Sequence, residues 1–298
     1  MTEFLQLCFA GLALGARYAL VALGFVIIYR ATGVINFAQG GLLAVGAYLT
    51  YAFANDAGLP FALAVVLALA FSALLGAAVE RTMLRPMIGQ PVFAVIMITI
   101  GLLFILEQVV TTVWGYDSLN LADPWGVDTV RAGDVVMSVR DLWTLGLAAA
   151  VLAGFFAFFR LSKLGVAMRA TALDPEAALA QGISARRVFA VSWAISAALA
   201  ALAGVTLASG PAALSPGIGA IALVAFPAMI VGGLDSPIGA VVGGIIIGLT
   251  QALTAGYQED LFPWAGDNFG AVMPYLVMIL ILLVRPYGLF GTKEVRRV

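Results

Sequence analysis

The sequence contains no histidine and a single cysteine, and it has few charged residues. Without histidine, the chain can form no Ser-His-Asp triad, no histidine metal site and no histidine proton relay. The one cysteine, Cys8, cannot form an intrachain disulfide. Charged residues make up 10% of the chain, compared with about 25% in soluble domains. The formal net charge of −1 leaves no basic excess of the kind that indicates nucleic-acid binding.

Sequence motifs of enzyme chemistry are missing as well. The chain has no H-E-x-x-H metal motif, no G-x-x-x-x-G-K-[ST] phosphate loop and no dinucleotide fingerprint after a predicted strand. Intramembrane proteolysis would need paired aspartates within apolar segments, whereas the aspartates of this chain are expected in polar connections. We therefore expect a non-catalytic protein that binds no metal and no cofactor of its own.

Apolar residues dominate the chain, at 63% of its length. They form continuous runs rich in Ala, Leu, Gly and Val, which predict membrane-spanning helices and not the alternating segments of a membrane β-barrel. The expected fold class is an all-α polytopic membrane protein, with residues 1–298 as a single transmembrane domain. The expected spans cover approximately residues 4–29, 42–53, 60–80, 92–114, 142–159, 188–209, 218–233, 238–255 and 271–284.

The expected number of spans is eight or nine, because one segment is irregular. Residues 218–233 form a short run that contains Pro227 and ends in Gly232 and Gly233, so this segment is expected to be short, kinked or partly re-entrant. The number of spans is eight if this segment does not cross the membrane fully, or if the first two spans are the two halves of one broken helix pair. Small residues recur in the spans, as in the G-x-x-x-G pattern that starts at Gly239, and predict close helix packing.

The distribution of basic residues predicts the orientation. When the loop at about 160–187 is placed inside and the spans alternate, two basic residues fall outside, both in the loop at about 115–141, and Arg17 lies within the membrane. The inner residues are Arg30, Arg81, Arg85, Arg160, Lys163, Arg169, Arg186, Arg187, Arg285, Lys293, Arg296 and Arg297. Because basic residues in short loops mark the cytoplasmic side, we expect loop 160–187 and the C-terminus in the cytoplasm.

Two ionisable residues, Arg17 and Glu107, are expected within spans. An unpaired charge near the middle of a bilayer costs at least ~2–3 kcal/mol, so each should face protein or water. Their opposite signs suggest an intramembrane ion pair between Arg17 and Glu107. The alternative is that Arg17 presents its positive charge to an anionic group in a transport pathway.

The Gly- and amide-rich stretch 31–41 is a candidate pathway segment. Asn36 and Gln39 share one helical face, next to Phe37, Gly40 and Gly41, and irregular membrane segments often line a polar cavity. Alternatively, Asn36 caps the second span and Gln39 bonds to backbone.

The second Gly-rich break, at Gly232 and Gly233, belongs to the same candidate pathway. For these small residues, tight helix packing within the chain is the alternative interpretation.

A short helix is expected within the loop at 160–187. Asp174 is a suitable N-cap and Pro175 suits the first helical position, while Glu176 favours the helix dipole. The helix continues through Ala177 and Leu179 and should stop at Gly182. It is either a connector on the membrane surface or a docking helix for a soluble partner.

This loop, RLSKLGVAMRATALDPEAALAQGIS, resembles the cytoplasmic loop of ABC-importer permeases of the branched-chain amino acid type, the LivH/LivM group. Three further stretches resemble blocks of the same family: GLALGARYALVALGFVIIYRATGVINFAQGGLLAVGAYL, AFPAMIVGGLDSPIGAVVGGIIIG and RPYGLFG. Their order is that of the family, and the N-F-A-Q-G sequence is more similar to the H-type (LivH-like) permease than to its M-type partner. Arg17, Glu107 and the Ser-Pro of D-S-P-I-G depart from the family pattern.

The resemblance implies a permease of the bacterial inner membrane that receives branched-chain or related amino acids from a periplasmic binding protein. A homologous LivM-like permease would share the translocation path, and two cytoplasmic ATPase subunits would bind ATP and Mg²⁺. The coupling helix would comprise Ala172, Leu173, Asp174, Pro175, Glu176, Ala177, Leu179 and Gly182. Alternatives are a relative importing urea, amides or aromatic or carboxylic acids, an ATP-independent transporter or channel, or a structural membrane subunit.

Overall fold

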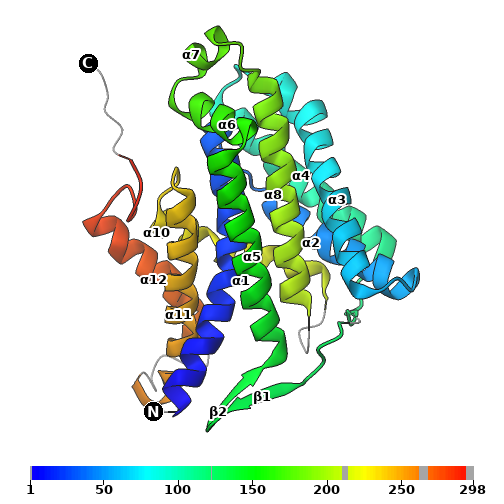
Figure 1. Ribbon diagram of the computed structural model, residues 1–298, viewed down its shortest axis with the longest axis vertical. Helices are drawn as coiled ribbons and strands as arrows, with labels where there is room; N and C mark the ends of the chain where they lie inside the picture. The colour runs from blue at the N-terminus through cyan, green and yellow to red at the C-terminus, as the bar shows by residue number, and fades with distance from the viewer. Residues whose placement is uncertain (1, 122, 210–213, 262–267, 293–298) are drawn as a thin grey trace.

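The structure is a computed structural model that describes residues 2–121, 123–209, 214–261 and 268–292. The described part is mostly helical, which confirms the expected all-α class (Figure 1). The elements, with η marking π and 3-10 turns, are α1 (Thr2–Thr32), α2 (Gln39–Tyr51), η1 (Ala52–Asp56), α3 (Phe61–Val79), η2 (Glu80–Leu84), η3 (Arg85–Met87), α4 (Val92–Trp114), β1 (Thr129–Ala132), β2 (Val135–Ser138), α5 (Val139–Leu161), α6 (Lys163–Leu173), α7 (Pro175–Ala180), α8 (Ala185–Ala208), η4 (Pro216–Ala220), α9 (Ile221–Val224), α10 (Phe226–Gly232), α11 (Pro237–Leu261) and α12 (Phe269–Val284).

Six helices of the described residues are long and apolar enough to cross a membrane, namely α1, α3, α4, α5, α8 and α11. The segment Pro216–Gly232 and α12 are shorter apolar helices. The chain is therefore a multi-pass membrane protein. Each of the six long helices overlaps an expected span, and α4 has the bounds that the sequence predicts, 92–114. The count of eight or nine crossings stays a prediction.

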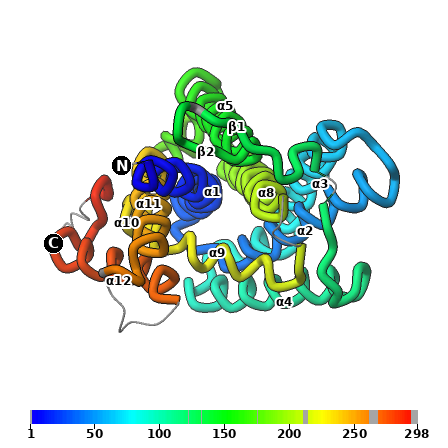
Figure 2. Tube along the Cα trace, turned by 90° about the horizontal axis from the view of Figure 1, so that it is seen from below, coloured from blue at the N-terminus to red at the C-terminus, as the bar shows by residue number. Residues whose placement is uncertain are grey.

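Two helices form the centre of the bundle. The most apolar part of α1 is 83% buried and that of α8 is 67% buried, whereas the corresponding parts of α4 and α5 are each 17% buried (Figure 2). On the outer helices, large apolar side chains such as Leu74, Phe93 and Leu283 are exposed. A water-soluble protein would bury such side chains, so these outer surfaces face lipid or another membrane subunit.

Glycine allows α1 and α11 to pack backbone against backbone. A Cβ atom added to Gly248 would lie 2.2 Å from the backbone nitrogen of Gly15, and one added to Gly244 would lie 2.6 Å from the nitrogen of Ala19. Within the G-x-x-x-G pattern, a Cβ on Gly239 would lie 2.2 Å from the carbonyl oxygen of Gly232. These contacts confirm the predicted tight packing. In lipid the hydrophobic effect does not drive helices together, so close packing of this kind holds them in contact.

The irregular segment expected at 218–233 is indeed broken. It consists of η4, α9 and α10, with Pro227 in the first turn of α10. η4 packs against the start of α2, where a Cβ on Gly40 would lie 2.4 Å from the carbonyl oxygen of Gly219. The start of α2 and the 3-10 turn η4 therefore meet inside the bundle. Figure 2 shows α9 between α4 and α12, on the side of the molecule opposite α5.

The two ends of the bundle differ. α6 and α7 lie at one end, and the antiparallel hairpin of β1 and β2 lies at the other (Figure 1). The sequence predicted one helix in the loop at 160–187, but there are two, because α6 precedes α7 and Asp174 separates them. The hairpin within the predicted outer loop 115–141 was not expected.

Candidate functional site

The expected short helix of the loop is α7, and its cap is the one that the sequence predicts. The Asp174 carboxylate accepts hydrogen bonds from the backbone N–H groups of Glu176, at 3.0 Å, and Ala177, at 2.9 Å. At the other end, Gly182 has a φ of +80°, a left-handed conformation in which glycine is unstrained. The predicted Ala172–Gly182 helix is corrected in one respect, since Ala172 and Leu173 belong to α6.

Apolar side chains project from this polar loop. Leu173 is 82% exposed and Leu179 is 55% exposed, whereas Ala178, on the same short helix, is buried. One side of α7 is thus held by the protein, and the other presents leucine outward. Exposed leucines beyond the apolar body of a membrane protein mark a surface for the membrane boundary or for another protein.

The loop is tied to the end of α5. Arg169 of α6 donates hydrogen bonds to the carbonyl oxygens of Phe159 and Arg160, and its guanidinium carbon lies 5.4 Å from the ring centre of Phe159. The hydroxyl of Ser162 caps α6 by accepting from the N–H of Gly165 at 2.9 Å. Because these contacts are short-range and polar, α6 and the end of α5 should move together.

The two amides of the candidate pathway segment are buried within the chain. Asn36 and Gln39 are 1% and 0% exposed. The Asn36 amide donates to Oε1 of Gln39 at 3.4 Å, and the Gln39 amide donates to the carbonyl oxygen of Ser196 at 3.4 Å. The hydroxyl oxygen of Ser196 lies 2.8 Å from the carbonyl oxygen of Gly24. This network joins α1, α2 and α8 and supports the alternative in which Gln39 bonds to backbone.

Asn36 does not cap α2 directly. Its Oδ1 accepts from the N–H of Ala38 at 3.1 Å and so forms a turn before the helix, whose N-cap position is Ala38 itself. The neighbouring Phe37 is half-buried, stacks on Phe226 of α10 at 6.1 Å and donates its N–H to Thr99 of α4. These contacts hold the break between α1 and α2 against both α4 and α10.

The candidate pathway glycines take part in packing. A Cβ on Gly41 would lie 2.9 Å from Cβ of Leu106, and one on Gly233 would lie 2.5 Å from the backbone nitrogen of Gly291. In addition, the N–H of Phe290 donates to the carbonyl oxygen of Gly232 at 3.0 Å. The family-like ending RPYGLFG is thereby paired with the end of α10.

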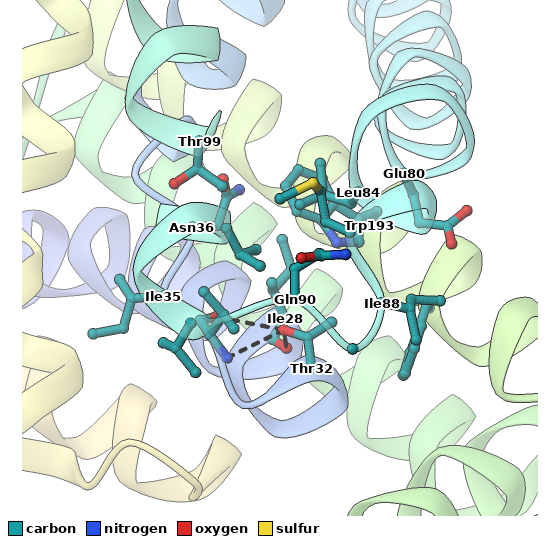
Figure 3. Close-up of a pocket in the computed structure, with 16 residues that line it drawn as sticks. Ile28, Thr32, Ile35, Asn36, Glu80, Leu84, Ile88, Gln90, Thr99 and Trp193 are labelled. Carbon is teal, nitrogen blue, oxygen red and sulfur yellow. Dashed lines mark hydrogen bonds between the residues drawn. The ribbon is translucent and has the colours of Figure 1, made fainter. Parts of the chain in front are cut away.

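A small cavity of about 200 Å³ opens beside Asn36 (Figure 3). It lies between the ends of α1 and α3 and the starts of α4 and α8. Figure 3 shows the Glu80 carboxylate directed away from Asn36, and Glu80 pairs with Arg85 at 2.8 Å. The hydroxyl of Thr99 donates to the carbonyl oxygen of Ile96. These polar groups already have partners in the chain, whereas the buried Nε1–H of Trp193, which also lines the cavity, has no hydrogen-bond partner among the described residues.

The predicted ion pair between Arg17 and Glu107 is wrong. Arg17 pairs instead with Asp141, at 2.6 Å, and both side chains are mostly buried. Asp141 was expected in the outer loop but lies in the first turn of α5, so its carboxylate reaches Arg17 of α1. Arg140 extends the cluster by donating to the carbonyl oxygen of Ser209, just after α8, at 3.0 Å. The cluster joins α1, α5 and the end of α8.

Glu107 lies elsewhere, on α4. One of its carboxylate oxygens is 3.4 Å from the position that a Cβ of Gly219 would occupy, beside η4, and its side chain is half-exposed. Ser196 and Asp141 are site residues that the sequence reasoning missed. A serine inside an apolar span and an aspartate at the edge of a loop carry no distinctive spacing, so only their three-dimensional partners identify them.

Sequence similarity to known transport permeases extends over nearly the whole chain. The family model for the branched-chain amino acid transport system permease component matches residues 7–282. The chain is 31% identical to the high-affinity branched-chain amino acid transport permease LivH of Escherichia coli K12, covering 99% of this chain and 98% of that protein. It is 32% identical, with the same coverage, to the permease BraD of Pseudomonas aeruginosa. It is 28% identical to the permease LivM of E. coli K12, covering 91% of this chain and 67% of that protein.

The fold is similar to that of a solved structure. In the structure titled PsaBC from Streptococcus pneumoniae in complex with Fab, one chain aligns with a TM-score of 0.50 and 17% identity, covering 95% of this chain and 92% of that chain. At this identity the likeness concerns the fold alone. The family model and the full-length LivH match together lead to a single conclusion. This chain belongs to the family of branched-chain amino acid transport permeases and is a LivH-like member of it.

Proposed function

We propose that this chain is one of two permease subunits in an ATP-driven importer of branched-chain or related amino acids. A periplasmic binding protein would deliver the substrate, and a LivM-like permease would complete the path. Two cytoplasmic ATPase subunits would bind ATP and Mg²⁺. The names of the matching LivH, BraD and LivM proteins support this substrate class. The observation that carries the coupling role is the capped helix α7, which presents exposed leucine at one end of the bundle.

The end that carries α6 and α7 is proposed to face the cytoplasm of a bacterial inner membrane. Basic residues gather in the loops that the alternation assigns to this end, whereas Arg131 and Arg140 lie at the hairpin end. This asymmetry is the one that fixes orientation in helical membrane proteins. With this orientation the chain would cross nine times if α2 and the segment from η4 to α10 both pass through the membrane, and eight times if one of them does not.

In the proposed mechanism, closure of the ATPase dimer displaces α7. Leu173, Glu176 and Leu179 would contact the ATPase, and the hydrogen bonds of Arg169 would pass the movement from α6 to α5. ATP can drive transport only if these contacts differ between the inward-facing and outward-facing states. In this mechanism ATP hydrolysis acts on the permease through α7, which lies away from the proposed substrate path.

The substrate path is proposed to run along the side where η4 and α9 lie between α4 and α12. Interrupted helices line polar cavities in many transporters, and here two interruptions meet at Gly40 and Gly219. Asn36, Gln39 and the glycines would hold these interruptions in place. Phe37, which is half-buried, would contact the substrate.

The coupling role is tested by L179E in the complete transporter, reconstituted with the subunits with which the chain co-purifies. The proposal predicts loss of substrate-stimulated ATPase activity with normal membrane insertion. V127E is a matched control, because Val127 is 84% exposed and lies in the loop at the opposite end. Full coupling in L179E would contradict the proposal. Transport in liposomes without ATP would instead indicate a secondary transporter or channel.

A further inference from the structure

A groove of about 870 Å³ lies between α5 and α11, at the end of the bundle that carries α6 and α7. Figure 1 shows α5 and α11 on either side of α1. It is separate from the proposed substrate path, which lies on the other side of the molecule (Figure 2). None of the coupling or pathway residues predicted from the sequence lines it.

The charged residues of the groove are mostly basic. Arg30, Arg160 and Arg169 line it, with Asp235 as the one acidic lining residue. Asp235 already accepts a hydrogen bond from the N–H of Thr292 at 3.2 Å. Three arginines and one aspartate give the groove a formal net charge of +2, on a surface next to the membrane. Such a surface attracts an anion.

Two of the arginines contact the same aromatic ring. The guanidinium carbons of Arg30 and Arg169 lie 5.5 Å and 5.4 Å from the ring centre of Phe159. Among the described residues, the Arg30 guanidinium has this ring contact and donates no hydrogen bond, so its N–H groups are available to a ligand. An anion between the two guanidinium groups would relieve their repulsion and accept these hydrogen bonds.

The remaining wall of the groove is apolar. Ile238, Val241 and Val242 lie on one face of α11, at the helical spacing i, i+3 and i+4, and Phe156 lies on α5. Ile238 is 59% exposed. A site for a small soluble anion has no need of such a wall. A charged rim above an apolar wall matches the boundary between the headgroup and the acyl chain of a lipid.

We propose that this groove binds an anionic phospholipid. Its phosphate would lie near Arg30, Arg160 and Arg169, and one acyl chain would lie along Phe156 and Val242. Because Arg169 belongs to α6, the bound lipid would contact the segment that connects α7 with α5. The proposal does not depend on the identity of the transported substrate.

Native mass spectrometry of the full-length chain, with any subunits that co-purify, tests this proposal. The probes are phosphatidylglycerol and phosphatidylcholine with identical acyl chains. The wild type should retain phosphatidylglycerol preferentially, and R160Q/R169Q should bind it roughly 30-fold more weakly, about fivefold for each charge removed. R186Q/R187Q is the matched control, because it removes the same charge from exposed positions at the start of α8. Equal binding by both double variants would overturn the proposal.

Two further measurements separate a lipid from a free phosphate. V242W fills the apolar wall and leaves every charge in place, so it should also weaken phosphatidylglycerol binding while its size-exclusion profile stays that of the folded protein. An excess of inorganic phosphate should leave the bound lipid in place. Wild-type binding by V242W, or displacement of the lipid by phosphate, would show that the groove recognises only an anion and would refute the lipid site.

Discussion

At the scale of single residues, the polar side chains inside this membrane protein mainly connect its helices. Gln39 reaches Ser196 of α8, and Arg17 reaches Asp141 of α5. Both interactions lie within one chain, so each of these side chains already has a partner in this structure. Removing one member of such a pair leaves a buried polar group without a partner, and that is more costly than removing both.

The Arg17–Asp141 pair gives the first prediction. R17M should destabilise the protein by up to ~3 kcal/mol, because the mostly buried Asp141 carboxylate keeps only its longer contact with Arg140, at 3.8 Å. R17M/D141L should recover much of that loss. The measurement is thermal unfolding of both variants in detergent, with substrate selectivity of the folded fraction as a second readout. A well-expressed R17M protein with altered selectivity would show that Arg17 serves the transport path instead.

A second prediction concerns the Gln39 network. Q39L removes the hydrogen bonds to Asn36 and to the Ser196 carbonyl, and each buried group left unsatisfied costs about 1–3 kcal/mol. We expect a lower unfolding temperature and little change in the substrate concentration needed for half-maximal transport. T112V, on the exposed side of α4, is a control that should unfold like the wild type. A Q39L protein of unchanged stability that binds substrate poorly would contradict this assignment.

At the scale of helices, close backbone approach determines which pairs can form. α1 and α11 meet at glycines along their length, and a Cβ at Gly248 would lie 2.2 Å from backbone. By contrast, a Cβ at Gly146 of α5 would meet nothing within 4 Å. The same residue type therefore has different consequences in two helices of the same bundle.

The third prediction follows from this contrast. G248A should strongly destabilise the protein, because backbone atoms cannot yield as a flexible side chain can. G146A should be neutral or stabilising by about 0.5–1 kcal/mol, since alanine favours a helix more than glycine does. Unfolding of the isolated chain in detergent compares the two variants. Equal stability of G248A and G146A would mean that α1 and α11 are not as close as the structure places them.

The cap of α7 gives a fourth prediction. D174A removes the acceptor for two backbone N–H groups and should cost about 1 kcal/mol of local helix stability. α7 should then fray, so that hydrogen exchange accelerates within the loop and substrate-stimulated ATPase activity falls in part. D174N keeps an acceptor at the cap and should restore both. Slow exchange in D174A, equal to that of the wild type, would exclude the capping role.

At the scale of the whole molecule, apolar patterning predicted the class and most of the helices. Continuous apolar runs identify α4 and its neighbours because a membrane allows few other structures. Proline and glycine predicted the break at 218–233, and Asp174 and Gly182 predicted α7. The resemblance to the LivH/LivM group was confirmed by the family match.

Other features needed the fold. The sequence offered Arg17 one opposite charge within a span, but the pair depends on the tilt and ends of α1 and α5, which bring Asp141 close. The partner of Gln39 is 157 positions away in the chain. α6 carries basic and small residues without a clear apolar face, so its pattern resembles that of a polar loop. Contacts between distant elements cannot be inferred from local periodicity.

We propose that α7 lies in the cytoplasm and is moved by separate ATPase subunits. The most direct test of this proposal is cross-linking from L179C in a C8S background, which leaves one cysteine in the chain. A membrane-impermeant thiol reagent should label this position only from the cytoplasmic side, and a short cross-linker should join it to a soluble ATPase subunit. Labelling from the outer side, or no cross-link to a soluble protein in the assembled transporter, would contradict the account.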